Sequence, residues 1–183
     1  MSISPSTVVN LPLPRWAYVP GESADAAPDH DTLWQAKALV PSQFRGFVPA
    51  RHPALRYGIA LNDAGYFWES HQVLETVWAA VPQGGRERIL LRACIQIANA
   101  NLKLRINKPH AAVRLFGAAL GELNALGARM ATVAGGGFAD VFPIAALTAV
   151  LQIKLGKPSL SASDWMKIWP DMKKNADFGV RKP

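Results

Sequence analysis

Apolar residues recur at helical spacing along most of this chain, whereas the period-two alternation of a β-strand is never sustained over four residues. The pattern predicts a short helix within residues 29–40, a second from Pro53, and longer ones over about 66–81, 86–106, 109–130 and 143–155. A further short helix is expected between Ser161 and Pro170. We therefore expect an all-α protein, with more than half of the chain in helices and no sheet.

Prolines and glycines mark the breaks between these helices. Five prolines fall within residues 1–30, which cannot form a regular helix and are expected to be an extended arm. Trp16 and Tyr18 are expected to hold this arm against the body, because large rings rarely sit free in solvent. We divide the chain into this N-terminal arm with its short helix, residues 1–50, and a helical bundle, residues 51–183.

The sequence between Pro82 and Gly85 predicts a tight turn, which makes residues 66–81 and 86–106 an antiparallel helix hairpin. In the second helix apolar residues fall on nearly every face, a pattern typical of a central, buried helix. We expect this hairpin at the centre of a single-domain bundle.

One polar stripe interrupts the otherwise apolar helix at 66–81. His71 and Glu75 are about 40° apart around a helix, and Trp78 lies within about 20° of His71. These three side chains therefore share one stripe, while Glu69 points about 160° away from His71.

A second polar stripe runs along the next helix at spacings of four, three and four, through Arg92, Gln96, Asn99 and Lys103. Folding the hairpin about its turn places Arg92 opposite Glu75, and Gln96 opposite His71. We expect an ion pair between Glu75 and Arg92, with their charged groups within about 6 Å of each other. Trp78 is expected to form an apolar lid near the turn.

The first interpretation of these stripes is a chemical site. His71 and Glu75 would bind a divalent metal ion or act as a catalytic acid/base couple, for instance in hydrolysis. A protein-held metal usually needs a third ligand, which would come from Glu69, His52, His110 or another chain. The H-E-x-x-H signature of zinc proteases is absent.

The alternative is a non-catalytic helical scaffold or protein-interaction module. In this interpretation Arg92 bonds to Glu75 and Gln96 to His71, and the buried network fixes the register of the hairpin. The positive charge of Arg92 would also oppose a metal ion beside Glu75. The sequence leaves both interpretations open.

Composition and charge narrow the class of protein. The 183 residues suit one domain, and half of them are hydrophobic while 18% are charged, which is typical of a compact protein. The net charge of +7 is concentrated in residues 86–114, but no nucleic-acid-binding motif accompanies it, which disfavours nucleic acid as a partner. The single cysteine, Cys94, excludes an internal disulfide and a Cys-based zinc site.

The sequence also bears on location and partners. No window reaches the roughly 18 apolar residues that span a bilayer, and the start does not resemble a secretory leader, so we expect a cytoplasmic protein. The helix Ile144–Leu155 is apolar almost all round, and Trp165 and Trp169 follow it. Either the arm and tail cover this surface or a partner does, which favours a homodimer. No small-molecule substrate is indicated.

The stretch LNDAGYFWESHQVLETVW, followed by LLRACIQIANANLKLRINKPHAAVRL, resembles the bacterial and archaeal family catalogued as domain of unknown function 309, over about residues 53–125. The hallmark of that family is His, three residues, Glu, two residues, then Trp or Tyr, and it stands here as His71, Glu75 and Trp78. The resemblance implies an all-helical fold and a motif suggested to bind metal, without implying an activity. Family members usually carry Glu where this chain has Gln72, so any role of that second carboxylate is missing.

Overall fold

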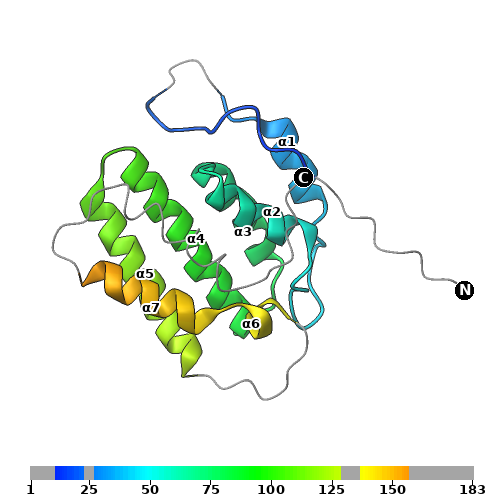
Figure 1. The fold of residues 1–183 in the computed structure, drawn as a ribbon. Helices are drawn as coiled ribbons and strands as arrows, with labels where there is room; N and C mark the ends of the chain where they lie inside the picture. Colours follow the sequence, from blue (N-terminus) through cyan, green and yellow to red (C-terminus); the bar gives the residue numbers. More distant parts are fainter. Residues whose placement is uncertain (1–10, 23–26, 129–136, 157–183) are drawn as a thin grey trace, which may run out of the picture.

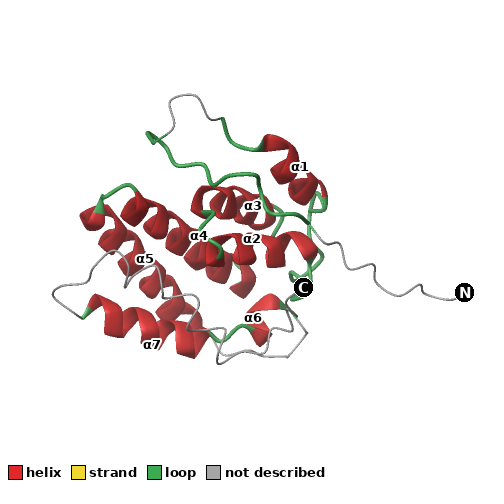
Figure 2. Cartoon of the chain, turned by 45° about the horizontal axis from the view of Figure 1, so that its top comes forward, coloured by secondary structure: helices red, strands yellow, loops and turns green. Residues whose placement is uncertain are grey.

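The computed structural model describes residues 11–22, 27–128 and 137–156. Most of these residues lie in helices (Figures 1 and 2). The helices are α1 (His30–Ala38), α2 (Pro53–Asp63), α3 (Phe67–Ala79), α4 (Arg86–Arg105), α5 (Pro109–Gly127), α6 (Phe138–Val141) and α7 (Ile144–Leu155). The described residues contain no strand beyond a single isolated bridge between Pro49 and Gly137. The predicted all-α fold is confirmed.

Proline and residues in the left-handed region set the boundaries of these helices. Pro53 and Pro109 stand in the first turns of α2 and α5, where the missing N–H has no helical partner to lose. Gly84, with φ 78°, makes the turn between α3 and α4, and Asn107, with φ 56°, makes the turn between α4 and α5. Both turns are short, so α3, α4 and α5 run antiparallel to their neighbours.

Helix α4 is the centre of the molecule. It packs against α3 on one side and α5 on the other, while α1 and α2 lie on α3 and α7 lies on α5 (Figure 1). Its 20 residues contain neither Gly nor Pro, and Leu90, Leu91 and Ile97 have no exposed surface. The expectation of a central hairpin with a largely buried second helix is confirmed.

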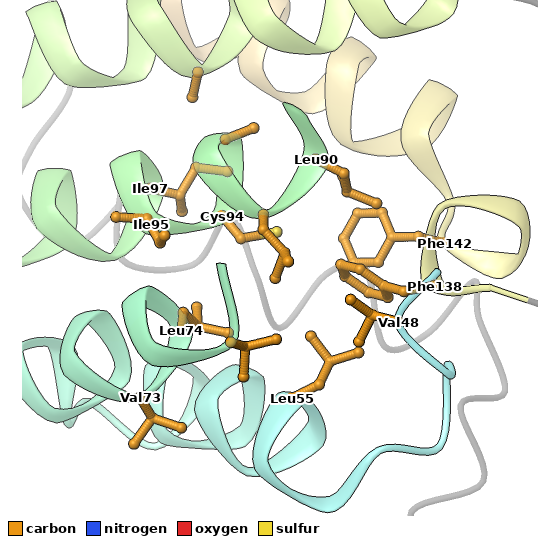
Figure 3. Close-up of a cluster of buried hydrophobic side chains, with 14 of the residues drawn as sticks. Val48, Leu55, Val73, Leu74, Leu90, Cys94, Ile95, Ile97, Phe138 and Phe142 are labelled. Carbon is orange, nitrogen blue, oxygen red and sulfur yellow. The ribbon is translucent and has the colours of Figure 1, made fainter. Parts of the chain in front are cut away.

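The segment that contains α6 closes one end of the core. Phe138 and Phe142 pack edge to face and lie beside Val48, Leu55 and Leu90 (Figure 3). Both oxygens of the buried Glu87 carboxylate accept the N–H of Ala139, at 3.0 and 3.1 Å. This helix of four residues was not predicted from the sequence.

Several expectations fall on residues that the structure does not describe. They concern the first ten residues of the arm, the end of the helix predicted to reach residue 130, the short helix before Pro170, and the tryptophans Trp165 and Trp169. None of the helices in the described ranges is long and apolar enough to cross a membrane.

At Gly58, helix α2 packs closely against Leu74 and Val73 of α3. A Cβ there would lie 2.8 Å from Leu74 Cδ2, and Leu74 is itself buried, so its side chain would have to shift within the core. We expect Gly58→Ala to lower the free energy of unfolding by about 1–3 kcal/mol, since overpacking outweighs the gain in helix propensity. The control Gly117→Ala, whose Cβ would meet nothing within 4 Å in α5, should raise it by up to about 1 kcal/mol. Urea denaturation measures both, and equal effects would contradict this packing.

Glu87 makes stability depend on pH. Burial raises the pKa of its carboxyl to about 7, with Asp140 adding to the shift and the Ala139 N–H and Arg86 opposing it. The folded chain therefore keeps a proton that the unfolded chain loses near its ordinary pKa of 4.5. The stabilisation is complete below that value and is lost as the pH rises through about 7.

We expect Glu87→Gln to reduce the difference in unfolding free energy between about pH 5 and about pH 8, compared with wild type. Glu22→Gln, at a half-exposed position, is the matched control and should leave that difference unchanged. Urea titrations at the two pH values measure it, and an undiminished difference in Glu87→Gln would refute the assignment.

Candidate functional site

His71 and Glu75 bond to each other along α3. The distance from His71 Nε2 to Glu75 Oε1 is 3.0 Å, and their side chains are 19% and 51% exposed. The sequence predicted that both side chains share one stripe, and their contact agrees with that. The stripe borders solvent, however, and does not face the interior of the bundle.

The positive charge beside this pair comes from α1. Lys37 Nζ donates a hydrogen bond to Gln72 Oε1 at 3.2 Å. Partial burial lowers the pKa of Lys37, and the nearby Glu75 carboxylate opposes this shift without cancelling it. Lys37, Gln72, Glu75 and His71 therefore form one polar rim between α1 and α3.

Trp78 lies near the turn of the hairpin, where the sequence predicted an apolar lid, and its polar contacts join the two helices. Its indole Nε1–H donates to the carbonyl oxygen of Arg88 at 3.1 Å. The Arg88 guanidinium lies 3.7 Å from the centre of the indole ring and donates to the carbonyl oxygens of Trp78 and Val81. These contacts tie the end of α3 to the start of α4.

The predicted ion pair between Glu75 and Arg92 was wrong. Arg92 Nη2 bonds to Glu122 Oε1 of α5 at 2.5 Å, and the Arg92 side chain is 56% exposed. Helix α4 lies between α3 and α5, and Arg92 turns towards α5 while Glu75 turns towards α1. Gln96 is half-buried on the Arg92 side of α4 and has no hydrogen bond to His71 among the described residues. The two polar stripes therefore do not converge.

Glu69 points away from His71, as its angle on the helix predicted. It is fully buried, and its Oε1 accepts the main-chain N–H of Tyr18 at 2.6 Å. Its Oε2 is buried without a hydrogen-bond partner. Burial raises the pKa of Glu69, against the opposing effect of the Tyr18 N–H. Glu69 thus belongs to the contact between the arm and the body.

The described residues contain no group of three or more His, Cys, Asp or Glu side chains that could hold a metal ion together. His52 packs edge to face on Phe44, and burial lowers its pKa. His110 lines an open depression of about 450 Å³ at the turn between α4 and α5, together with Lys108 and Arg114. The thiol of Cys94 is buried and has its pKa raised to about 12, so it stays protonated.

Residues 55–115 match the model of a family described as Domain of unknown function (DUF309). This match spans about a third of the chain, and it agrees with the resemblance seen in the sequence. No curated protein and no solved structure matches the chain. The DUF309 segment holds most of α2, all of α3 and α4 and the start of α5, and it includes His71, Glu75 and Trp78. It leaves out Lys37 and Glu122, which contact residues inside it.

The partners that the sequence analysis missed lie on other helices, and two of them could have been inferred from the positions of the turns. Arg92 and Glu122 stand equally far from Asn107, so a hairpin about that residue would have paired them. Arg88 lies near Trp78 across the predicted turn and could also have been inferred. Lys37 could not have been inferred, because no local sequence pattern shows which helix α1 packs against.

The bond from Trp78 to Arg88 predicts a cost for removing the indole nitrogen. Trp78→Phe leaves the Arg88 carbonyl without its partner and weakens the cation–π contact, and should lower the free energy of unfolding by about 1–2 kcal/mol. Trp34→Phe, at a position 69% exposed, should change it by less than about 0.5 kcal/mol. Thermal and urea denaturation give both values, and equal losses would contradict a structural role for Trp78.

Proposed function

We propose that this protein is a non-catalytic helical interaction module, in which the His71–Glu75–Trp78 motif stabilises one flank of the central hairpin. The observation that carries the proposal is that the motif side chains bond within the chain. His71 bonds to Glu75, and Trp78 bonds to the main chain of Arg88. Side chains that bond within the chain in this way favour one arrangement of helices over others, even at positions that are partly exposed, as here.

The surroundings of the motif also support a structural role. Catalytic sites usually combine a concave pocket with several converging polar groups. Here the pair stands at a rim, with Lys37 as its neighbouring cation. The positive charge of a lysine near Glu75 repels a divalent ion.

A second candidate is a divalent metal or acid/base site at His71 and Glu75, with a hydrolytic reaction as one outcome. It is favoured by the bond of 3.0 Å between imidazole and carboxylate and by the exposure of Glu75, because a half-open His–Glu pair can accept a proton or a cation. His71 and Glu75 would be two ligands, and further ligands would have to come from water, substrate or a second chain. Glu69 is a poor third ligand because it points to the arm.

Thermal unfolding of wild type, His71→Ala and Glu75→Gln, each with a chelator and with added Zn²⁺ or Mn²⁺, separates the candidates. For the structural role we expect no effect of chelator or metal on any of the three. Each substitution should cost less than about 1 kcal/mol, because half-exposed ion pairs contribute little. Glu122→Gln is the matched control, since it removes a carboxylate from another ion pair of the same module.

A metal site would give the opposite result. A bound ion at a hundred times its Kd stabilises the folded state by about 2.7 kcal/mol, and both motif variants would lose this gain while Glu122→Gln would keep it. That outcome would contradict the proposal of an interaction module and would support a metal-dependent function.

A further inference from the structure

The arm, here residues 11–19, is held against the helices partly through its own main chain. Tyr57 of α2 donates its hydroxyl to the carbonyl oxygen of Pro12 at 2.6 Å, and Glu69 of α3 accepts the N–H of Tyr18 at 2.6 Å. Asp29, at the start of α1, accepts the N–H of Arg15 at 3.1 Å. Three helices thus contribute one anchor each, and the arm lies along α2 and α3 (Figure 2).

The arm sequence Leu-Pro-Leu-Pro-Arg favours an extended chain with free carbonyl groups. Pro12 and Pro14 fix φ near −65°, and each restricts the leucine before it to extended conformations. Such a sequence favours a polyproline II conformation, in which the main-chain groups make no internal hydrogen bonds. Aromatic-lined grooves recognise peptides in this conformation. Pro14 is buried, and the aromatic ring of Tyr18 packs edge to face on Trp68 at 5.0 Å between centroids.

An acidic residue recognises the arginine of the arm. Asp29 bonds to Arg15 Nε at 3.2 Å and to Nη2 at 3.3 Å, and it is 2% exposed while the Arg15 side chain is 68% exposed. The bonds from Arg15 lower the pKa of Asp29 to about 2, so the carboxylate stays ionised. Burial raises the pKa of Tyr57 to about 12, which keeps its hydroxyl as a donor.

We propose that the surface formed by Asp29, Tyr57 and Glu69 is a docking site for an extended, proline-rich peptide that carries an arginine, and that the chain's own residues 11–19 occupy it in this structure. Tyr57 and Glu69 bind main-chain groups, which any extended peptide offers. Asp29 supplies the selectivity for arginine after the prolines. The binding surface and the segment that occupies it would thus belong to the same chain.

The buried oxygen of Glu69 shows that the arm does not satisfy this surface completely. Glu69 Oε2 has no hydrogen-bond partner although the residue is 0% exposed. A partner peptide with one more N–H at this position would donate a hydrogen bond to Glu69 Oε2. This extra bond would help the peptide to compete with the arm, whose effective concentration is high because it belongs to the same chain.

This inference rests on the proposed function as an interaction module, because it names the partner class. The two can fail separately. The docking site uses neither His71 nor Glu75, so a metal at the motif would leave peptide binding unchanged, while a failure of peptide binding would leave the structural role of the motif intact.

The test uses the full chain and a fluorescein-labelled peptide with the sequence of residues 11–19, followed by anisotropy. An arm-weakened variant, Pro14→Ala with Arg15→Ala, should bind this peptide at least about tenfold more tightly than wild type does, because its own arm competes less. The same peptide carrying Arg15→Ala should bind the variant at least about fivefold more weakly.

Substitutions of the receptor surface complete the experiment. Tyr57→Phe in the arm-weakened chain removes one hydroxyl and should weaken peptide binding by about fivefold or more. Asp29→Asn serves as a second receptor variant if Tyr57→Phe does not fold. His110→Ala, which changes no residue of this surface, should leave binding unchanged.

Three results would overturn the proposal. One is equal peptide affinity for wild type and the arm-weakened chain, and another is full affinity after Tyr57→Phe or Asp29→Asn. The third is a wild-type dimer, by light scattering, that dissociates in the arm-weakened chain, because the occupant would then be the arm of a second copy.

Discussion

The structure depends on the burial of α4 from both sides. Most of its residues are buried between α3 and α5, and each fully buried leucine or isoleucine contributes about 1.5–3 kcal/mol. A helix with so many buried residues cannot stand at an edge of the bundle. Its neighbours must cover it, and the short turns at Gly84 and Asn107 bring the preceding and following helices back against it. The order of α3, α4 and α5 follows from this requirement.

Buried polar contacts then fix how the remaining helices sit on this three-helix centre. Asn101 of α4 donates to Asn62 of α2 at 3.1 Å, and Ser70 of α3 donates to the carbonyl oxygen of Gly58 at 2.7 Å. Apolar packing alone is tolerant of sliding, whereas a buried donor without its acceptor is costly. These pairs therefore set the position of α2, and through Tyr57 and Glu69 they set the course of the arm.

The sequence predicted the helices and the hairpin well because both depend on local signals. Continuous apolar periodicity identified α4, and the glycines after Pro82 identified the turn. Contacts between helices were predicted less well. The expected partner of Glu75 was Arg92, on the basis of the hairpin of α3 and α4. Helix α4 also forms a hairpin with α5 about Asn107, and Arg92 pairs with Glu122 across it. The cation that does lie near Glu75 is Lys37. Its place depends on how α1 lies on α3, and no local pattern encodes that. The angle of Glu69 on its helix was predicted, but its bond to Tyr18 required the path of the arm.

The central claim is that the His71–Glu75–Trp78 motif of this DUF309 segment is satisfied within the chain and supports the hairpin. Elemental analysis of the full protein, purified without a histidine tag and without added metal or chelator, tests it most directly. The account predicts less than about one tenth of an equivalent of Zn²⁺, Mn²⁺, Fe or Ni per chain, unchanged in His71→Ala, because a His–Glu pair with a neighbouring lysine holds a metal weakly. About one equivalent of a single metal in wild type, lost in His71→Ala and Glu75→Gln but kept in Glu122→Gln, would contradict it.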